Sequence, residues 1–290
     1  MSILITGANG IVGKDLVEML SKKHKIVGIY RTKNSQIKKI KNVKWIKHNL
    51  KKKIKKIIPS PKYIIHSAVD QIYKKKNKKK YISSNFKILK NIVNFAKENK
   101  VKLIVNISSL EIYGEIKKKL LDEKYYPQNP NTYGSIKFLS EKYLYKCDIN
   151  FINLRIPGVL CEGSRNQLER PWLNSVFNKM KKNELIYVHN LKSKFNNVIN
   201  TRELTRLTNF LIKKKIIIRD TFNFACKKPL TIKDILITAK KKLRSKSKIE
   251  ELKNYNKKTF CISTNKIEKK LGFKIQSTKN VLKKHLPNFR

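Results

Sequence analysis

Residues 2–13 read Ser2-Ile3-Leu4-Ile5-Thr6-Gly7-Ala8-Asn9-Gly10-Ile11-Val12-Gly13. The apolar run Ile3 to Ile5 predicts a short strand, which breaks at a glycine-rich turn and continues as a helix. Gly7 suits a tight turn with positive φ, Gly10 lets the backbone approach a pyrophosphate, and Gly13 lets the helix lie close to the strand. The same pattern also fits a turn without a ligand. Its position between a strand and a helix favours a dinucleotide site, with the anion on the free N–H groups of the helix.

Strands and helices alternate from this turn to about residue 156. Near-continuous apolar runs predict strands that are buried on both faces of a parallel sheet. The alternation therefore predicts an α/β fold with a Rossmann-type doubly wound parallel sheet. The predicted strands are Lys25–Tyr30, Val43–Lys47, Tyr63–Ala68 and Lys102–Ile107, and a long helix is predicted at Tyr81–Glu98.

The alternation weakens after Arg155-Ile156-Pro157-Gly158. We expect a dinucleotide-binding domain at residues 1–158 and a smaller mixed α/β substrate-binding lobe at residues 159–290. Residues 195–213 are expected to pack back on the first domain. The lobe should cap the carboxyl ends of the strands, where open α/β sheets bind ligands. Its predicted elements are helices at 167–181, 201–213 and 231–243 and strands near 185–188 and 221–224, with 244–258 the least structured stretch.

The charge balance is strongly basic. Of 290 residues, 69 are Lys or Arg and 19 are Asp or Glu, which gives a formal net charge of +50. Such an excess can indicate an acidic partner such as nucleic acid or an anionic membrane. Most of the basic residues are lysines in solvent-facing runs, and Lys, Ile and Asn all have A/T-rich codons. We therefore favour base composition as the explanation and expect only nonspecific, salt-sensitive binding to polyanions.

The four cysteines are widely scattered and form no C-x-x-C pair, so we expect neither a disulfide framework nor a metal site. The five histidines show no ligand spacing. No apolar run approaches the roughly 20 residues of a membrane span. We expect a cytoplasmic protein with no membrane partner.

A second group of polar residues lies near the middle of the chain. Ser109 ends a predicted strand, and Tyr133 and Lys137 are four residues apart at the start of a predicted helix, so they share one face. A phenol with an ordinary pKa of about 10 is a poor acid–base group near neutrality, but an adjacent ammonium stabilises the phenolate and lowers that pKa. Tyr133 and Lys137 alone would fit an exposed chance pair. The glycine turn and the serines at the strand end favour an acid–base role.

These motifs, in this order, resemble the extended short-chain dehydrogenase/reductases, the superfamily that includes the NAD-dependent epimerase/dehydratase family and its nucleotide-sugar modifying branch. The resemblance covers nearly the whole chain and does not fix the substrate. It rests on Thr6-Gly7-Ala8-Asn9-Gly10-Ile11-Val12-Gly13, His66-Ser67-Ala68, Asn85, Ser108-Ser109, Tyr113-Gly114, Glu123, Pro130, Tyr133-x-x-x-Lys137, Glu141, Arg155-x-Pro157-Gly158 and Lys270-Leu271-Gly272-Phe273.

The resemblance implies that Tyr133 is the catalytic acid–base, that Lys137 lowers its pKa and holds the nicotinamide ribose, and that Ser109 orients the reacting hydroxyl or carbonyl. It also implies a homodimer, paired through the helices at 81–98 and 132–147. His66 would lie near the nicotinamide as a packed neutral histidine. The implied cofactor-binding residues are Gly7, Asn9, Gly10, Ile11, Gly13, Arg31, Asn49, Leu50, Ser67, Ala68, Asn85, Tyr133 and Lys137.

The end of the second strand departs from NAD-using relatives, in which an acidic residue binds the adenosine ribose. Tyr30-Arg31 stands here instead. With no carboxylate to repel a 2′-phosphate, and with Arg31 and Lys33 to pair with it, we expect NADP as the cofactor, with NAD as the alternative.

The substrate side is less well matched. In sugar 4,6-dehydratases an Asp-Glu pair follows the Ser/Thr, and the Asp protonates the departing hydroxyl. Leu110-Glu111 stands here, so dehydration is disfavoured, while epimerisation and carbonyl reduction stay open. Relatives often grip the nucleotide diphosphate with an Arg where this chain has Asn196 or Asn197. The expected substrate-binding residues are Ser109, Glu111, Arg165, Trp172 and Asn196.

Two hypotheses follow. The first is an NAD(P)-dependent sugar epimerase or ketoreductase, with a substrate that is a nucleotide-activated sugar for surface polysaccharide. The second is a catalytically inactive relative that binds RNA or another polyanion. The retained Ser109, Tyr133 and Lys137 favour the first and speak against a specific nucleic-acid partner, as does the lack of aromatic residues among the basic runs.

Overall fold

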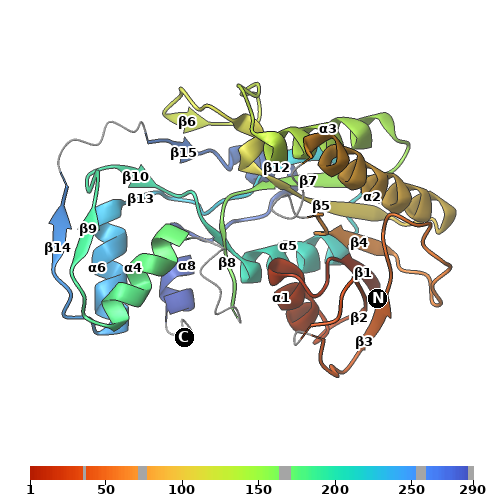
Figure 1. Cartoon of the computed structure of the whole chain (residues 1–290), viewed down its shortest axis with the longest axis horizontal. Helices are drawn as coiled ribbons and strands as arrows, with labels where there is room; N and C mark the ends of the chain where they lie inside the picture. Colours follow the sequence, from red (N-terminus) through yellow and green to blue (C-terminus); the bar gives the residue numbers. More distant parts are fainter. Residues whose placement is uncertain (35–36, 71–76, 163–170, 253–258, 287–290) are drawn as a thin grey trace. The chain divides into compact units, whose positions relative to one another are not determined.

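A seven-stranded sheet forms the centre of the larger part of the protein (Figure 1). The computed structural model describes residues 1–34, 37–70, 77–162, 171–252 and 259–286. The strand order is β12-β7-β5-β4-β1-β2-β3. The predicted Rossmann-type α/β fold is confirmed. The strands are β1 (Ser2–Thr6), β2 (Lys25–Tyr30), β3 (Val43–Lys47), β4 (Tyr63–His66), β5 (Leu103–Ser109), β7 (Phe151–Ile156) and β12 (Arg219–Asn223).

The central strands are buried along their length because helices cover both faces of the sheet. Strand β1 pairs in parallel with both β2 and β4, and β4 pairs in parallel with β5. The edge strand β3 is only partly buried. All the carboxyl ends of these parallel strands therefore meet at one edge of the sheet, where α/β folds place their ligands.

Amphipathic helices supply the rest of this core. Helix α2 (Lys78–Glu98) begins at Asn77, whose side chain accepts a hydrogen bond from the Lys80 amide. Its apolar face packs on the sheet: Ile88, Leu89 and Ile92 join strand residues in one buried cluster. Helix α3 (Thr132–Lys146) lies beside α2 (Figure 1). The other helices of this part are α1 (Ile11–Leu20), η2 (Leu110–Tyr113) and most of α5 (Thr201–Lys213).

The chain divides into two compact units. The first comprises residues 1–115, 126–155 and 204–222, and the second comprises 116–125, 156–203 and 223–290. The first unit contains the glycine turn and the Tyr133–Lys137 pair. The assignment of cofactor binding to residues 1–158 and substrate binding to 159–290 stays a prediction.

The described residues of the second unit form helices and four two-stranded sheets. Its short strands pair β10 with β13, β11 with β8, β14 with β9 and β15 with β6. Its elements are β6 (Leu120–Leu121), β8 (Val159–Leu160), α4 (Pro171–Lys181), β9 (Ile186–Val188), β10 (Lys194–Phe195), β11 (Ile199–Asn200), β13 (Leu230–Thr231), α6 (Ile232–Leu243), β14 (Ile249–Glu251), β15 (Cys261–Ile262), α7 (Asn265–Leu271) and α8 (Thr278–His285).

Two elements differ from the sequence-based expectation. The strand predicted near 221–224 was placed in the second half, but it is β12, an edge strand of the large sheet. The amide of Phe151 donates to the carbonyl of Ile218, and Asn153 Nδ2 donates to Thr221 Oγ1. Strand β14 lies within the stretch expected to be least structured, and it pairs in parallel with β9. Both pairings join residues distant in sequence, which local periodicity does not reveal.

Candidate active site

The glycine turn joins β1 to α1 as predicted. Gly7 has φ +67°, and a Cβ there would lie 2.8 Å from the Ala68 Cα. A Cβ on Gly13 would lie 2.1 Å from the Gly7 carbonyl oxygen, so α1 can approach the turn only through a glycine. Gly10 caps α1 with extended backbone and without a side-chain hydrogen bond. The helix therefore begins at a turn where three glycines leave the backbone uncovered by side chains of their own, which fits a pyrophosphate.

The end of β4 lies against this turn. Ser67 Oγ donates to the Thr6 carbonyl oxygen at 2.7 Å, and Thr6 Oγ1 lies 2.7 Å from His66 Nδ1. His66 is buried, and burial, with the positive charge of Lys137, lowers its pKa to about 3. His66 is therefore neutral at neutral pH, as expected.

Three other predicted cofactor residues have contacts within the protein. Asn85 Oδ1 accepts from the Asp70 amide at 2.8 Å, so this buried side chain holds the backbone at Asp70. Asn49 Oδ1 accepts from the Lys51 amide in a turn. Leu50 is buried in the same apolar cluster as α2. Their contacts with a cofactor stay predictions.

Arg31 has an acidic neighbour that its sequence context did not reveal. Arg31 Nη1 lies 3.1 Å from Asp70 Oδ1, and Lys51 Nζ lies 3.0 Å from Asp70 Oδ2. The expectation that no carboxylate lies beside Arg31 is therefore wrong. Asp70 was missed because it follows β4, 39 residues from Arg31, and only the fold brings the two together.

Helix α3 places Tyr133 and Lys137 on one face. Asn131 caps the helix by accepting from the Gly134 amide at 2.8 Å. Lys137 Nζ lies 5.6 Å from the centre of the Tyr133 ring and donates to the Ile107 carbonyl oxygen at 2.7 Å. Lys137 is buried and Tyr133 half-buried. The strand end of β5 thus fixes the ammonium beneath the phenol ring.

The charge of Lys137 reflects two opposing effects. Burial lowers its pKa to about 8, and the carboxylate of Glu141, one turn further along α3, acts to raise it. The side chain is therefore an ammonium at neutral pH. An ammonium in this position stabilises a phenolate on Tyr133.

Ser109 ends β5 and caps the following turn η2, where its Oγ accepts from the Glu111 amide at 3.1 Å. Glu111 Oε2 accepts from Asn131 Nδ2 at 2.8 Å, so its carboxylate joins η2 to the α3 cap. A Cβ on Gly134 would lie 2.1 Å from the Glu111 carbonyl oxygen, which shows how closely α3 packs on η2. Ser109 and Tyr133 therefore belong to two tightly joined elements.

A buried ion pair between Arg155 on β7 and Glu141 on α3 stabilises the elements that carry Ser109 and Tyr133. Arg155 Nη2 donates to Glu141 Oε2 at 2.7 Å, and Ser108 Oγ donates to Glu141 Oε1 at 2.6 Å. Arg155 Nη1 also donates to the Tyr113 hydroxyl at 2.9 Å. Breaking such a pair leaves an uncompensated buried charge. The network therefore holds α3, β5 and β7 in one arrangement.

The predicted substrate-binding residues outside this site lie in the second unit. Asn196 is buried, and its Nδ2 donates to the carbonyl oxygens of Cys226 and Ile262, each at 2.8 Å. Trp172 is partly exposed, and its ring centre lies 5.8 Å from that of Phe195. Arg165 lies outside the described residues.

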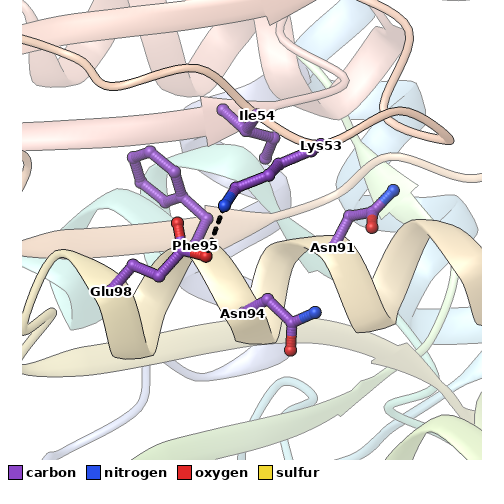
Figure 2. A pocket seen from close by; sticks show the side chains of 6 residues that line it. All are labelled: Lys53, Ile54, Asn91, Asn94, Phe95 and Glu98. Atoms are coloured by element: carbon purple, nitrogen blue, oxygen red, sulfur yellow. Dashed lines mark ion pairs between the residues drawn. The ribbon is translucent and has the colours of Figure 1, made fainter.

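A separate polar pocket lies along α2 (Figure 2). Lys53 and Glu98 form an ion pair at 2.9 Å on its rim. None of the predicted site residues lines it. The lining residues are Lys53, Ile54, Asn91, Asn94, Phe95 and Glu98.

Comparison with known proteins agrees with the class that this fold and site define. Residues 3–203 match the model of the NAD dependent epimerase/dehydratase family, and the chain belongs to that family. The resemblance to extended short-chain dehydrogenase/reductases and the prediction of an enzyme of this type are confirmed. No curated protein matches the chain in sequence.

Solved structures share the whole fold at low sequence identity. WbmH from Bordetella bronchiseptica, in complex with NAD⁺, is 18% identical with a TM-score of 0.73, over 100% of this chain and 98% of that one. UDP-glucose 4-epimerase from Thermotoga maritima, with UDP-glucose, is 16% identical with a TM-score of 0.76, over 100% of this chain and 99% of that one. UDP-N-acetylglucosamine 4-epimerase from Methanobrevibacter ruminantium is 18% identical with a TM-score of 0.78, over 99% of this chain and 97% of that one.

No helix within the described part of the chain is long and apolar enough to cross a membrane.

Proposed function

We propose that the protein is an NAD(P)-dependent sugar epimerase or ketoreductase that acts on a nucleotide-activated sugar, with Tyr133 as the acid–base. The observation that carries this proposal is the burial of Lys137 against the Ile107 carbonyl and beneath the Tyr133 ring. Among the lysines that the structure describes, Lys137 alone is buried. Burying an ammonium costs free energy, so its retention in a chain with so many surface lysines favours a functional role.

The chemistry divides between the cofactor and the chain. A nicotinamide cofactor held through its pyrophosphate at the glycine turn would accept or supply the hydride. In the direction of oxidation, Tyr133 as phenolate removes the proton of the sugar hydroxyl while Ser109 Oγ hydrogen-bonds the same oxygen. In the direction of reduction, Tyr133 as phenol returns that proton to the carbonyl oxygen. Lys137 stabilises the phenolate in both directions.

The substrate class is supported by the structural neighbours, among which are a UDP-glucose 4-epimerase crystallised with UDP-glucose and the enzyme WbmG in complex with NAD and UDP. Leu110 offers no acid for a departing hydroxyl, which disfavours dehydration. We place the nucleotide sugar in the lobe at residues 159–290, with Trp172 and Asn196 near it, and the homodimer contact on α2 and α3.

The test is the variant Tyr133→Phe, which removes the reacting hydroxyl and keeps the ring over Lys137. We expect turnover of a nucleotide sugar to fall by about 10²–10⁴-fold. The dissociation constant of the nicotinamide cofactor should stay within about twofold of wild type, because the glycine turn is untouched.

Tyr145→Phe is the matched control. Tyr145 also lies on α3, and its hydroxyl contacts Thr221 Oγ1 at 3.2 Å. This variant should keep its turnover. Wild-type turnover by Tyr133→Phe would reject the assignment of the acid–base.

A further inference from the structure

Asp70 is a buried carboxylate at the end of β4, with three donors around it. Its side chain is 5% exposed. Arg31 Nη1 reaches Oδ1 at 3.1 Å, while Lys51 Nζ and Ser84 Oγ reach Oδ2 at 3.0 and 2.5 Å. The three donors come from the end of β2, the loop after β3 and helix α2. Asp70 therefore joins three segments of the first unit.

This cluster adjoins the glycine turn. Asp70 follows Ala68 by two residues, and a Cβ on Gly7 would lie 2.8 Å from the Ala68 Cα. The loop after β2 is tied to the same turn, because Asn9 Nδ2 donates to the Thr32 carbonyl at 2.7 Å. Arg31 lies beside Thr32 in that loop. The Asp70 carboxylate thus lies at the strand ends where a bound dinucleotide would place its adenosine ribose.

The two cations are committed to this carboxylate. Arg31 and Lys51 are 53% and 32% exposed, and ion pairs between fully exposed groups contribute little. Asp70 is different because it is buried, and a buried carboxylate without partners costs several times more than a surface pair gains. A 2′-phosphate at Arg31 would compete with Asp70 for the positive charge of the guanidinium and would bring a second anion close to the carboxylate.

We infer that Asp70 determines the choice of cofactor: it occupies Arg31 and Lys51, repels a 2′-phosphate and selects NAD over NADP. It thereby supplies, from the end of β4, the negative charge that is missing at the end of β2. This inference rests on the proposed function and replaces the expectation of NADP, which depended on the absence of a carboxylate beside Arg31.

The experiment compares the dissociation constants of NAD⁺ and NADP⁺, measured by calorimetry on the full chain. Wild type should bind NAD⁺ more tightly. Asp70→Asn keeps the size of the side chain and one acceptor oxygen and removes its charge. It should tighten NADP⁺ binding by about tenfold relative to NAD⁺.

Glu98→Gln is the matched control. Glu98 lies on α2 and pairs with Lys53, so this variant also removes one carboxylate from an ion pair and changes the net charge by the same amount. It therefore corrects for the general attraction of a more basic protein for a phosphate. Its ratio of dissociation constants should equal that of wild type.

An unchanged ratio in folded Asp70→Asn would overturn the inference and leave the proposed function intact. If that variant does not fold, the wild-type ratio decides: NADP⁺ bound as tightly as NAD⁺ overturns the inference. Failure of wild type to bind either dinucleotide would overturn the proposed function as well.

Discussion

At the scale of single residues, Lys137 and His66 are both buried basic side chains, and only Lys137 is charged at neutral pH. The pKa of Lys137 is about 8, so its ammonium keeps its proton at neutral pH. Burial and the charge of Lys137 lower the pKa of His66 to about 3. Two positive charges at this depth would repel each other at low dielectric. The neutral imidazole accommodates the ammonium that the proposed chemistry requires.

His66 gives a prediction for stability against pH. Between its ordinary pKa of 6.5 and its folded pKa of about 3, the unfolded chain binds a proton that the folded protein does not. The free energy of unfolding should therefore fall as the pH falls through this window, by about 2 kcal/mol between pH 7 and pH 5 from His66 alone. His66→Asn should remove that part of the slope in urea unfolding.

His48→Asn serves as its control, because it replaces a histidine that is more exposed than His66. The slopes of the two variants are compared over the same pH range. Equal slopes for His66→Asn and wild type would contradict the neutral buried state of His66.

The residues of the site differ in how far the sequence could predict them. Tyr133 and Lys137 were found because a spacing of four places them on one helix face, and Gly7 and Gly13 because the turn adjoins a strand and a helix. Asp70 has no such local signal. Its partners lie on three other segments, and only the fold brings them to it.

At the scale of elements, the approach of α1 to the glycine turn depends on Gly13. A methyl group there would meet the Gly7 carbonyl oxygen at 2.1 Å, which is a contact with backbone that no side-chain rotation relieves. Gly13→Ala should shift the start of α1 and weaken binding of NAD⁺ by about tenfold or more, because the helix amides leave the pyrophosphate. Overpacking should also lower the free energy of unfolding by about 1–3 kcal/mol.

Titration with NAD⁺ measures the change in the dissociation constant, and urea unfolding measures the change in the free energy of unfolding. Glu18→Ala, at the opposite end of α1, should leave the NAD⁺ dissociation constant unchanged. Wild-type affinity in Gly13→Ala would show that the cofactor does not use this helix start.

Elements were predictable where local pattern determines them. The buried strands of a parallel sheet appear as apolar runs, so β2 and β3 begin and end at the predicted residues. Strand β12 was assigned to the wrong half and β14 was missed because the strands that they pair with lie far away in the sequence. Pairing between such segments is a property of the fold and leaves little periodicity in the sequence.

At the scale of the whole molecule, the net charge of +50 raises the alternative of a polyanion-binding relative without activity. The surface lysines account for that charge, whereas Lys137 is buried and held in a defined position. The enzyme hypothesis explains this difference, and a polyanion-binding surface does not. Weak RNA binding that salt abolishes would agree with either hypothesis.

The most direct test incubates the wild-type protein, with NAD⁺ or reduced cofactor, with a panel of nucleotide sugars, and follows both the absorbance of the reduced nicotinamide and the identity of the sugar. We predict that at least one sugar is converted. Isomer exchange without net change in reduced cofactor identifies an epimerase, and consumption of one reduced cofactor per sugar identifies a ketoreductase. Bound cofactor with no conversion of any nucleotide sugar would contradict the proposed function.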